Sequence, residues 1–227
     1  MRKLIGNKQF YKMVFVIVFP IIIQNGISNF VGLLDNIMIG QLGTLSMSGV
    51  SITNQLLSVF NIIIFGAMSG PGIFLAQFYG SKNNKGIQET FHFKYFIGCF
   101  IVIIALLIFI FYGENLISLY LTGNAKDTAT TLSYSMDYLH IMLIGLLPFM
   151  LSQIYSSTLR ETGDTFLPMV SATVALFTNF ILNYILIFGH LGLPMLGIKG
   201  AAIATVISRY IEFLLLVLFN FKSLFVK

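Results

Sequence analysis

One acidic side chain lies inside the first apolar stretch of the chain. Asp35 follows Leu33 and Leu34 in a stretch from Met13 to Ile39 that holds no other charged residue. Desolvating a charged carboxylate is costly, so ionisable groups inside membrane helices are rare and usually serve a function. Either a partner group or a proton must offset that cost. Asp35 is therefore the first candidate for ion chemistry.

Polar residues in four of the apolar stretches recur at helical spacing, which places them on common helix faces. The stripes are Gln24, Ser28, Gly32 and Asp35; Ser51, Asn54, Gln55, Ser58 and Asn61; Asn179 and Asn183; and Thr205, Ser208, Arg209 and Glu212. Such stripes do not comfortably face lipid. They either join helices, at roughly 0.6 kcal/mol per hydrogen bond, or line a wet cavity. Four striped helices, one with a carboxylate, favour the cavity.

Arg209 and Glu212 are the only opposite charges within one of these stripes. Their spacing of three residues fits an ion pair that neutralises itself within the helix. The alternative is that both face the cavity and contact substrate or relay protons. The sequence leaves both interpretations open.

Composition places all these residues in an integral membrane protein. Hydrophobic residues make up 57% of the 227 residues, charged residues 9%, and the mean hydropathy is +0.90. A soluble domain carries roughly 25% charged residues. The prediction is an all-α bundle, with residues 1–227 forming one domain. Its six expected spans are 13–39, 46–68, 91–113, 129–155, 166–188 and 200–221.

Basic residues predict how this bundle is oriented, because they are retained on the cytoplasmic side of a membrane. On one side fall Arg2, Lys3, Lys8, Lys12, Lys82, Lys85, Lys94, Arg160, Lys222 and Lys227, and on the other only Lys126 and Lys199. We therefore expect a multi-pass protein of the plasma membrane with both termini in the cytoplasm. The net charge of +5 reflects this orientation and not an affinity for nucleic acid.

No enzyme motif emerges from the sequence. It has no His-Glu-x-x-His metal pair, no Gly-x-Ser-x-Gly elbow and no phosphate-binding Gly-x-x-x-x-Gly-Lys loop. His92, His140 and His190 are too scattered in sequence to suggest a metal site. We expect neither an enzyme nor a bound cofactor other than a coupling ion.

Several strings along the chain are informative in their order and spacing. They are Phe19-Pro20-Ile21, Leu34-Asp35-Asn36-Ile37-Met38-Ile39-Gly40, Ala76-Gln77-Phe78-Tyr79-Gly80-Ser81-Lys82-Asn83, Leu159-Arg160-Glu161-Thr162-Gly163-Asp164-Thr165, Asn179-Phe180-Ile181-Leu182-Asn183-Tyr184 and Gly200-Ala201-Ala202-Ile203-Ala204-Thr205. Together they resemble the corresponding strings of the multidrug and toxic compound extrusion (MATE) transporters. The resemblance runs nearly end to end. It implies a six-helix lobe, and members of this family typically hold two such lobes in one chain. This chain then corresponds to the amino-terminal lobe, and the expected partner is a second six-helix lobe or a second copy.

The resemblance also implies a set of site residues. Asp35 is similar to the cation-coupling carboxylate of the first helix, and Asn179 to an asparagine of the fifth. Asn183 is a departure, because some relatives place a second acid there. Tyr138 and Thr205 resemble hydroxyl contributors to the same cluster, with Tyr134 as the alternative to Tyr138.

Two coupling ions stay open for this cluster. Burial disfavours the charged form of Asp35, so the carboxyl group can take up a proton on one side of the membrane and release it on the other. Alternatively, the carboxylate, amide and hydroxyl oxygens form a hard-oxygen shell that suits a sodium ion, by analogy with other small cations. Substrate and ion then share one cavity, with Gln24, Ser28, Asn54, Gln55, Arg209 and Glu212 as its expected substrate-facing residues.

The leading hypothesis is one half of a cation-coupled exporter of amphipathic organic cations that works by alternating access. A flippase for lipid-linked saccharides is the second transport hypothesis, and a markedly cationic cavity would favour it. A membrane subunit that assembles with another protein without transporting is the third.

Overall fold

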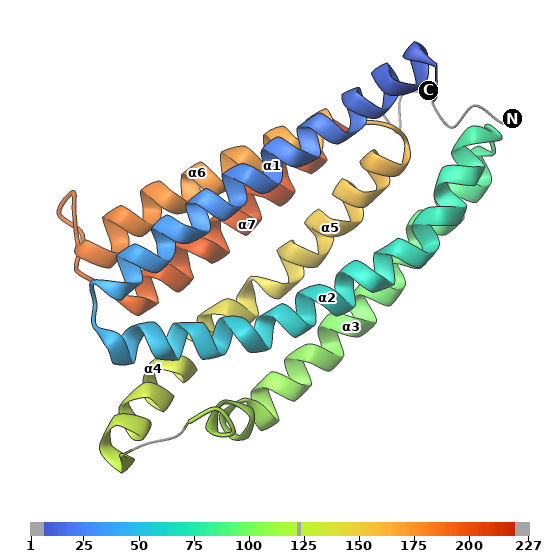
Figure 1. Cartoon of the computed structure of the whole chain (residues 1–227). Helices are drawn as coiled ribbons and strands as arrows, with labels where there is room; N and C mark the ends of the chain where they lie inside the picture. The colour runs from blue at the N-terminus through green and yellow to red at the C-terminus, as the bar shows by residue number, and fades with distance from the viewer. Residues whose placement is uncertain (1–6, 122–123, 221–227) are drawn as a thin grey trace, which may run out of the picture.

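The computed structural model describes residues 7–121 and 124–220, which form seven α-helices (Figure 1). Their bounds are α1 (Lys8–Gly40), α2 (Thr44–Gly80), α3 (Asn84–Ser118), α4 (Ala125–Ile144), α5 (Leu146–Glu161), α6 (Phe166–Phe188) and α7 (Ile198–Asn220). The predicted all-α class is confirmed. Five helices are each long and apolar enough to cross a membrane, and α4 with α5 forms a bent pair that makes a sixth.

Helix length follows from apolar content, and side-chain caps set two of the starts. The Asn7 side chain accepts from the Phe10 backbone N–H at the start of α1, and Asn83 accepts from Gly86 at the start of α3. The second and third helices have 37 and 35 residues, well beyond the ~20 that cross the hydrocarbon core. They therefore extend past the apolar windows from which their spans were predicted.

The bend between α4 and α5 divides the span expected at 129–155. The two helices meet at Gly145 at an angle of 49°. Pro148 lies in the first turn of α5 and has no N–H to donate to the Ile144 carbonyl, so the helical ladder is interrupted there. Pro20, by contrast, lies inside α1, which is continuous.

The helices alternate in direction, which gives the lobe two ends. The termini end holds Lys8 and Asn220, together with the α2–α3 and α5–α6 connections, and the opposite end holds the α1–α2 and α6–α7 connections. In Figure 1, α1, α6 and α7 form one group, α2 and α3 form a long hairpin, and α5 runs between them. The first polar stripe, which lies on α1, therefore belongs to the group that α1 forms with α6 and α7.

The buried core lies where α2, α4 and α5 meet, and the exposed outer faces of the helices are apolar as well. Ile64, Leu139, Leu146 and Met150 are fully buried. Phe96 of α3 is 74% exposed, as expected for a side chain that faces lipid. This pattern is typical of a membrane bundle and not of a soluble one.

The described basic residues keep the asymmetry predicted from the sequence, with one exception. Lys8, Lys12, Lys82 and Lys85 lie at the termini end, and Lys126 and Lys199 at the opposite end. Arg2, Lys3, Lys222 and Lys227 lie outside the described residues. Lys94 is not a flanking residue, because it is fully buried within α3. The orientation relative to the cytoplasm stays a prediction.

Candidate ion and substrate site

A cavity of about 370 Å³ opens among six of the helices. Its polar lining residues are Gln24, Ser28, Asp35, Asn54, Tyr138, Asn179, Thr205, Ser208, Arg209 and Glu212. Stripes that are far apart in the sequence therefore meet around one space. Met142, Phe149 and Leu176 add apolar surface to the same wall.

The Asp35 carboxylate is held by two amides of α6. Asn183 Nδ2 donates to Asp35 Oδ1 over 2.8 Å. The orientation of the Asn179 amide that satisfies both of its ends turns its nitrogen to Asp35 Oδ2 at 2.9 Å. Its oxygen then accepts from the backbone N–H and the hydroxyl of Thr205, each at 3.2 Å. Both carboxylate oxygens thus have an N–H donor, which suits the ionised form.

Among the residues that the structure describes, no basic side chain forms an ion pair with this carboxylate. Within the described part of the chain the ion pairs are Lys85–Glu89, Lys94–Glu161 and Lys199–Asp137. Asn183 Oδ1 is buried beside the carboxylate and has no hydrogen-bond partner among the described residues. The site therefore combines a half-buried negative charge with a free acceptor oxygen next to it.

Of the two tyrosines considered for this site, Tyr138 lines the cavity. It is 4% exposed and comes from α4. Tyr134 lies one turn earlier and lines a separate groove at the opposite end, with Asp137 and Lys199. Thr205 joins the cluster from α7, where its hydroxyl oxygen also lies 3.0 Å from the Ala201 carbonyl oxygen, an alternative acceptor for its single proton.

The remaining predicted cavity residues divide into lining and non-lining positions. Gln24 and Ser28 lie on the α1 face of the cavity, and the Ser28 hydroxyl donates to the Gln24 carbonyl at 2.9 Å. Asn54 lines the cavity from α2, but Gln55 is exposed and does not line it. Gln55 can contact substrate only if the cavity extends beyond this lobe.

Arg209 and Glu212 both line the cavity, and they form no ion pair with each other. Arg209 Nη1 instead donates to the Gly145 carbonyl at 3.2 Å. Its guanidinium carbon lies 5.0 Å from the centre of the Phe149 ring, in cation–π geometry. Of the two interpretations from the sequence, self-neutralisation is not what the geometry shows.

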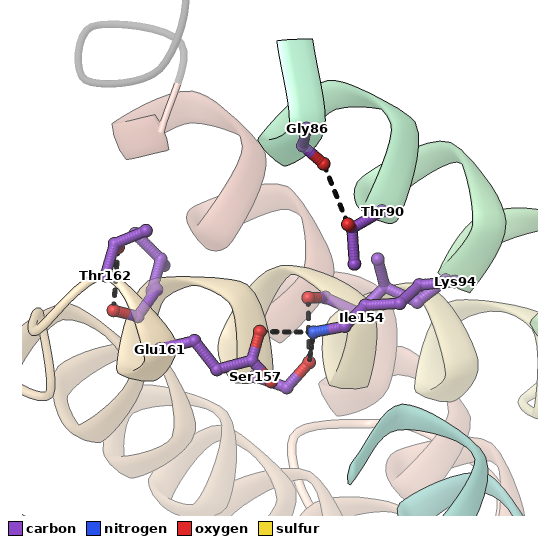
Figure 2. Close-up of polar contacts among 8 residues, drawn as sticks. Gly86, Thr90, Lys94, Ile154, Ser157, Glu161 and Thr162 are labelled. Atoms are coloured by element: carbon purple, nitrogen blue, oxygen red, sulfur yellow. Dashed lines mark hydrogen bonds and ion pairs between the residues drawn. The ribbon is translucent and has the colours of Figure 1, made fainter. Parts of the chain in front are cut away.

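A second polar cluster, not predicted from the sequence, joins α3 to α5 near the termini end (Figure 2). Lys94 Nζ donates to Ser157 Oγ at 3.1 Å and to Glu161 Oε2 at 2.5 Å. Gly72 of α2 faces Glu161 so closely that a Cβ there would overlap its carboxylate. The available signal was a lysine within an apolar helix, the same signal that singled out Asp35.

Comparison with known proteins identifies the family. A family model named MatE matches residues 20–185, more than half of the chain. The chain belongs to the MATE family. The members of this family are transporters and not enzymes.

Relatives with curated names agree on the family and differ in their named cargo. The chain is 29% identical over 196 residues to a probable multidrug resistance protein NorM of Thermotoga maritima, covering 85% of this chain and 40% of the relative. It is 31% identical over 206 residues to the probable multidrug resistance protein YoeA of Bacillus subtilis, covering 88% of this chain and 42% of that relative. It is 34% identical over 180 residues to a FAD transporter of Shewanella oneidensis, covering 78% of this chain and 38% of that relative. The chain thus spans about two fifths of these relatives.

Solved MATE structures share the fold. The chain superposes on an outward-facing MATE transporter with a TM-score of 0.76 at 19% identity, covering 93% of this chain and 44% of the other. For an inward-facing MATE transporter the TM-score is 0.75 at 19% identity, and the match covers 92% of this chain and 46% of the other. Both likenesses show that the lobe corresponds to about half of a MATE transporter.

Proposed function

We propose that this chain is one lobe of a transporter that exports organic cations in exchange for a proton or a sodium ion by alternating access across the plasma membrane. The observation that carries the proposal is the Asp35 carboxylate, held by Asn179 and Asn183 in the wall of a 370 Å³ cavity. A carboxylate placed there without a basic partner needs a mobile cation or a proton for neutralisation. Such exchange is what an antiporter requires.

The chemistry around Asp35 supports an ion site of either kind. A proton needs only the carboxylate and access from the cavity. A sodium ion needs several oxygen ligands, and Asn183 Oδ1 is an unpartnered oxygen adjacent to Asp35. The ion can be coupled to substrate only if the two bind the outward-open and inward-open states with different affinities.

Charge in the cavity supports a cationic cargo. Asp35 and Glu212 contribute two negative charges and Arg209 one positive charge, and Met142 and Phe149 add apolar surface. A cation with a hydrophobic body complements such a lining. A lipid-linked saccharide flippase was expected to have a markedly cationic cavity, so this lining does not favour that alternative. The relative named FAD transporter makes an anionic compound a useful comparison cargo.

The proposal requires a second lobe. The chain spans only 38–42% of the curated relatives described above. Asn25, Asn29 and Asn36 of α1 and Gln55 of α2 are polar yet exposed in the isolated lobe, which suits a water-filled cleft against another lobe. That partner is a carboxyl-terminal lobe or a second copy of this chain.

An Asp35→Asn variant tests the proposal in the complete two-lobed assembly. We expect it to abolish ion-driven efflux of a cationic dye while leaving expression unchanged, because the amide keeps the shape of the side chain but cannot exchange a charge. Asp127→Asn, on the exposed first turn of α4, is the matched control and should transport normally. Retained ion-driven efflux by Asp35→Asn would refute the proposal.

Dye-extrusion assays on the chain alone and on the two-lobed assembly together separate a transporter half from a subunit that only assembles with other proteins. In an efflux-deficient host the chain alone should give no extrusion unless it forms a complete pathway as a dimer. If the two-lobed assembly also fails with every cargo tested, the non-transporting alternative gains support.

A further inference from the structure

The α4–α5 bend lies directly against α7, and one glycine permits this approach. A Cβ added at Gly145 would lie 3.1 Å from Val206 Cγ2 and 3.3 Å from both Cδ and Nη1 of Arg209. These distances are tighter than ordinary contacts, so a larger residue would displace α7 or the arginine. The bend and Arg209 therefore occupy one closely packed junction.

Arg209 contacts both sides of this junction. Its Nη1 donates to the Gly145 carbonyl at 3.2 Å, the same oxygen that accepts the Phe149 backbone N–H at 3.2 Å as α5 begins. Its guanidinium carbon lies 5.0 Å from the Phe149 ring centre. A planar guanidinium can donate and stack at the same time, whereas an ammonium cannot. Arg209 thus contacts the residue at the bend and the aromatic residue one turn beyond it.

The same face of α7 reaches the carboxylate site. Thr205 lies four residues before Arg209, which places the two side chains on neighbouring turns of one face. Thr205 contacts Asn179, and Asn179 contacts Asp35. The bend in turn orients two cavity residues, Tyr138 on α4 and Phe149 on α5. One helix face therefore joins the ion site to the bend.

We propose that Arg209 is a positioning residue that fixes the α4–α5 bend through Gly145 and Phe149, and so holds the cavity in a binding-competent shape. This inference rests on the proposed function only in assigning substrate binding to the cavity. The guanidinium acts through the bend, and its charge is not a direct substrate contact.

Distances measured across the α4–α5 bend test whether Arg209 fixes the bend, and they need no transport assay. Spin labels at Ala129→Cys on α4 and at Phe166→Cys, five residues beyond the end of α5, are both at exposed positions and report the distance across the bend. They are measured in the full chain in lipid nanodiscs, with Cys99→Ser as background. We expect one narrow distance distribution with Arg209 present, and a broader or shifted one in Arg209→Gln and in Arg209→Lys. Phe149→Leu should broaden it too, and serves as the test if Arg209→Gln does not fold.

Ser208→Ala is the matched control for these distances. Its hydroxyl also lines the cavity, but it donates only within α7, to the Thr205 carbonyl at 2.8 Å, and so the distribution should not change. An unchanged distribution in Arg209→Gln would overturn the proposal. A distribution restored by Arg209→Lys would also overturn it, because charge alone would then suffice.

Binding of two dyes to the same samples separates positioning from direct charge contact. A cationic rhodamine and a neutral dye of similar size should both bind more weakly to Arg209→Gln, by the same factor. If the competent bend is then populated about one tenth of the time, that factor is about tenfold. Selectively tighter binding of the cation to Arg209→Gln would instead show a direct, repulsive charge contact and refute positioning. If neither dye binds saturably to the unsubstituted chain in the complete two-lobed assembly, the proposed function fails, while the distance result still decides whether Arg209 fixes the bend.

Discussion

At the scale of single residues, the lobe holds two charged side chains that lie inside apolar helices, the half-buried Asp35 and the fully buried Lys94, and the sequence analysis singled out only Asp35. Asp35 stood out because it lies inside an apolar stretch, and the structure places it in a cavity with the expected amides. Lys94 lies equally inside an apolar helix, yet its nearness to other basic residues led to its assignment as a flanking residue. Its partner Glu161 is 67 positions away, a pairing that helix periodicity cannot reveal.

Lys94→Met should strongly destabilise the lobe, because it leaves Glu161 without its buried partner. Removing one member of a buried ion pair typically costs about 3–5 kcal/mol. Replacing both, as Lys94→Met with Glu161→Gln, should recover most of that loss. Thermal unfolding in detergent measures both effects.

The control for Lys94 is a lysine of the same helix in an exposed pair. Lys85 lies 3.8 Å from Glu89, with side chains 86% and 67% exposed, and such surface pairs contribute little. Lys85→Met should therefore leave the unfolding temperature unchanged. Equal effects of the two single substitutions would contradict the buried-pair interpretation.

At the scale of helices, each apolar stretch marked in the sequence overlaps a helix or the bent pair of α4 and α5, but hydropathy did not reveal the shapes of these helices. The span expected at 166–188 coincides with α6 (Phe166–Phe188). The expected fourth span is two helices, and only the structure gives the position of the bend at Gly145 and its angle of 49°. Hydropathy averages over a window, whereas a bend depends on a single missing donor and on the helix that packs against it.

Gly200→Ala should disturb the contact between α6 and α7. A Cβ at Gly200 would lie 2.6 Å from the Leu186 carbonyl oxygen, and backbone atoms cannot yield as a flexible side chain can. Overpacking of this kind costs typically about 1–3 kcal/mol. Because Thr205 follows within α7, its contacts with Asn179 should weaken as well. Unfolding temperature and ion binding measured on one preparation report both effects.

Gly66→Ala is the control for Gly200→Ala, and its expected effect on stability has the opposite sign. Gly66 lies inside α2, and nothing is within 4 Å of its added Cβ. Alanine there should stabilise the helix by about 0.5–1 kcal/mol relative to glycine. A loss of stability at Gly66 as large as at Gly200 would mean that helix contact does not explain the result.

At the scale of the whole molecule, the lobe presents two kinds of surface that only its surroundings distinguish. The outer face of α3 is apolar, with Phe96 74% exposed, as lipid contact demands. The faces of α1 and α2 expose Asn25, Asn29 and Gln55, which lipid would leave without hydrogen bonds. Composition predicted a membrane protein, but which helix faces meet lipid follows from the packing of the helices and not from their hydropathy.

Cysteine labelling should distinguish these surfaces in the complete assembly, with Cys99→Ser as background. Gln55→Cys should react readily with a water-soluble, membrane-impermeant thiol reagent, because the reactive thiolate forms only where water reaches it. Phe96→Cys is more than a third exposed in the lobe yet should react slowly, since acyl chains exclude both water and reagent. A saturating cationic substrate should slow labelling at Gln55→Cys and leave Phe96→Cys unchanged, because in the proposed two-lobed assembly only Gln55 borders the water-filled cleft that extends the cavity. Equal labelling rates at the two positions would contradict a wet cleft on α2, and with it the need for a second lobe across that cleft.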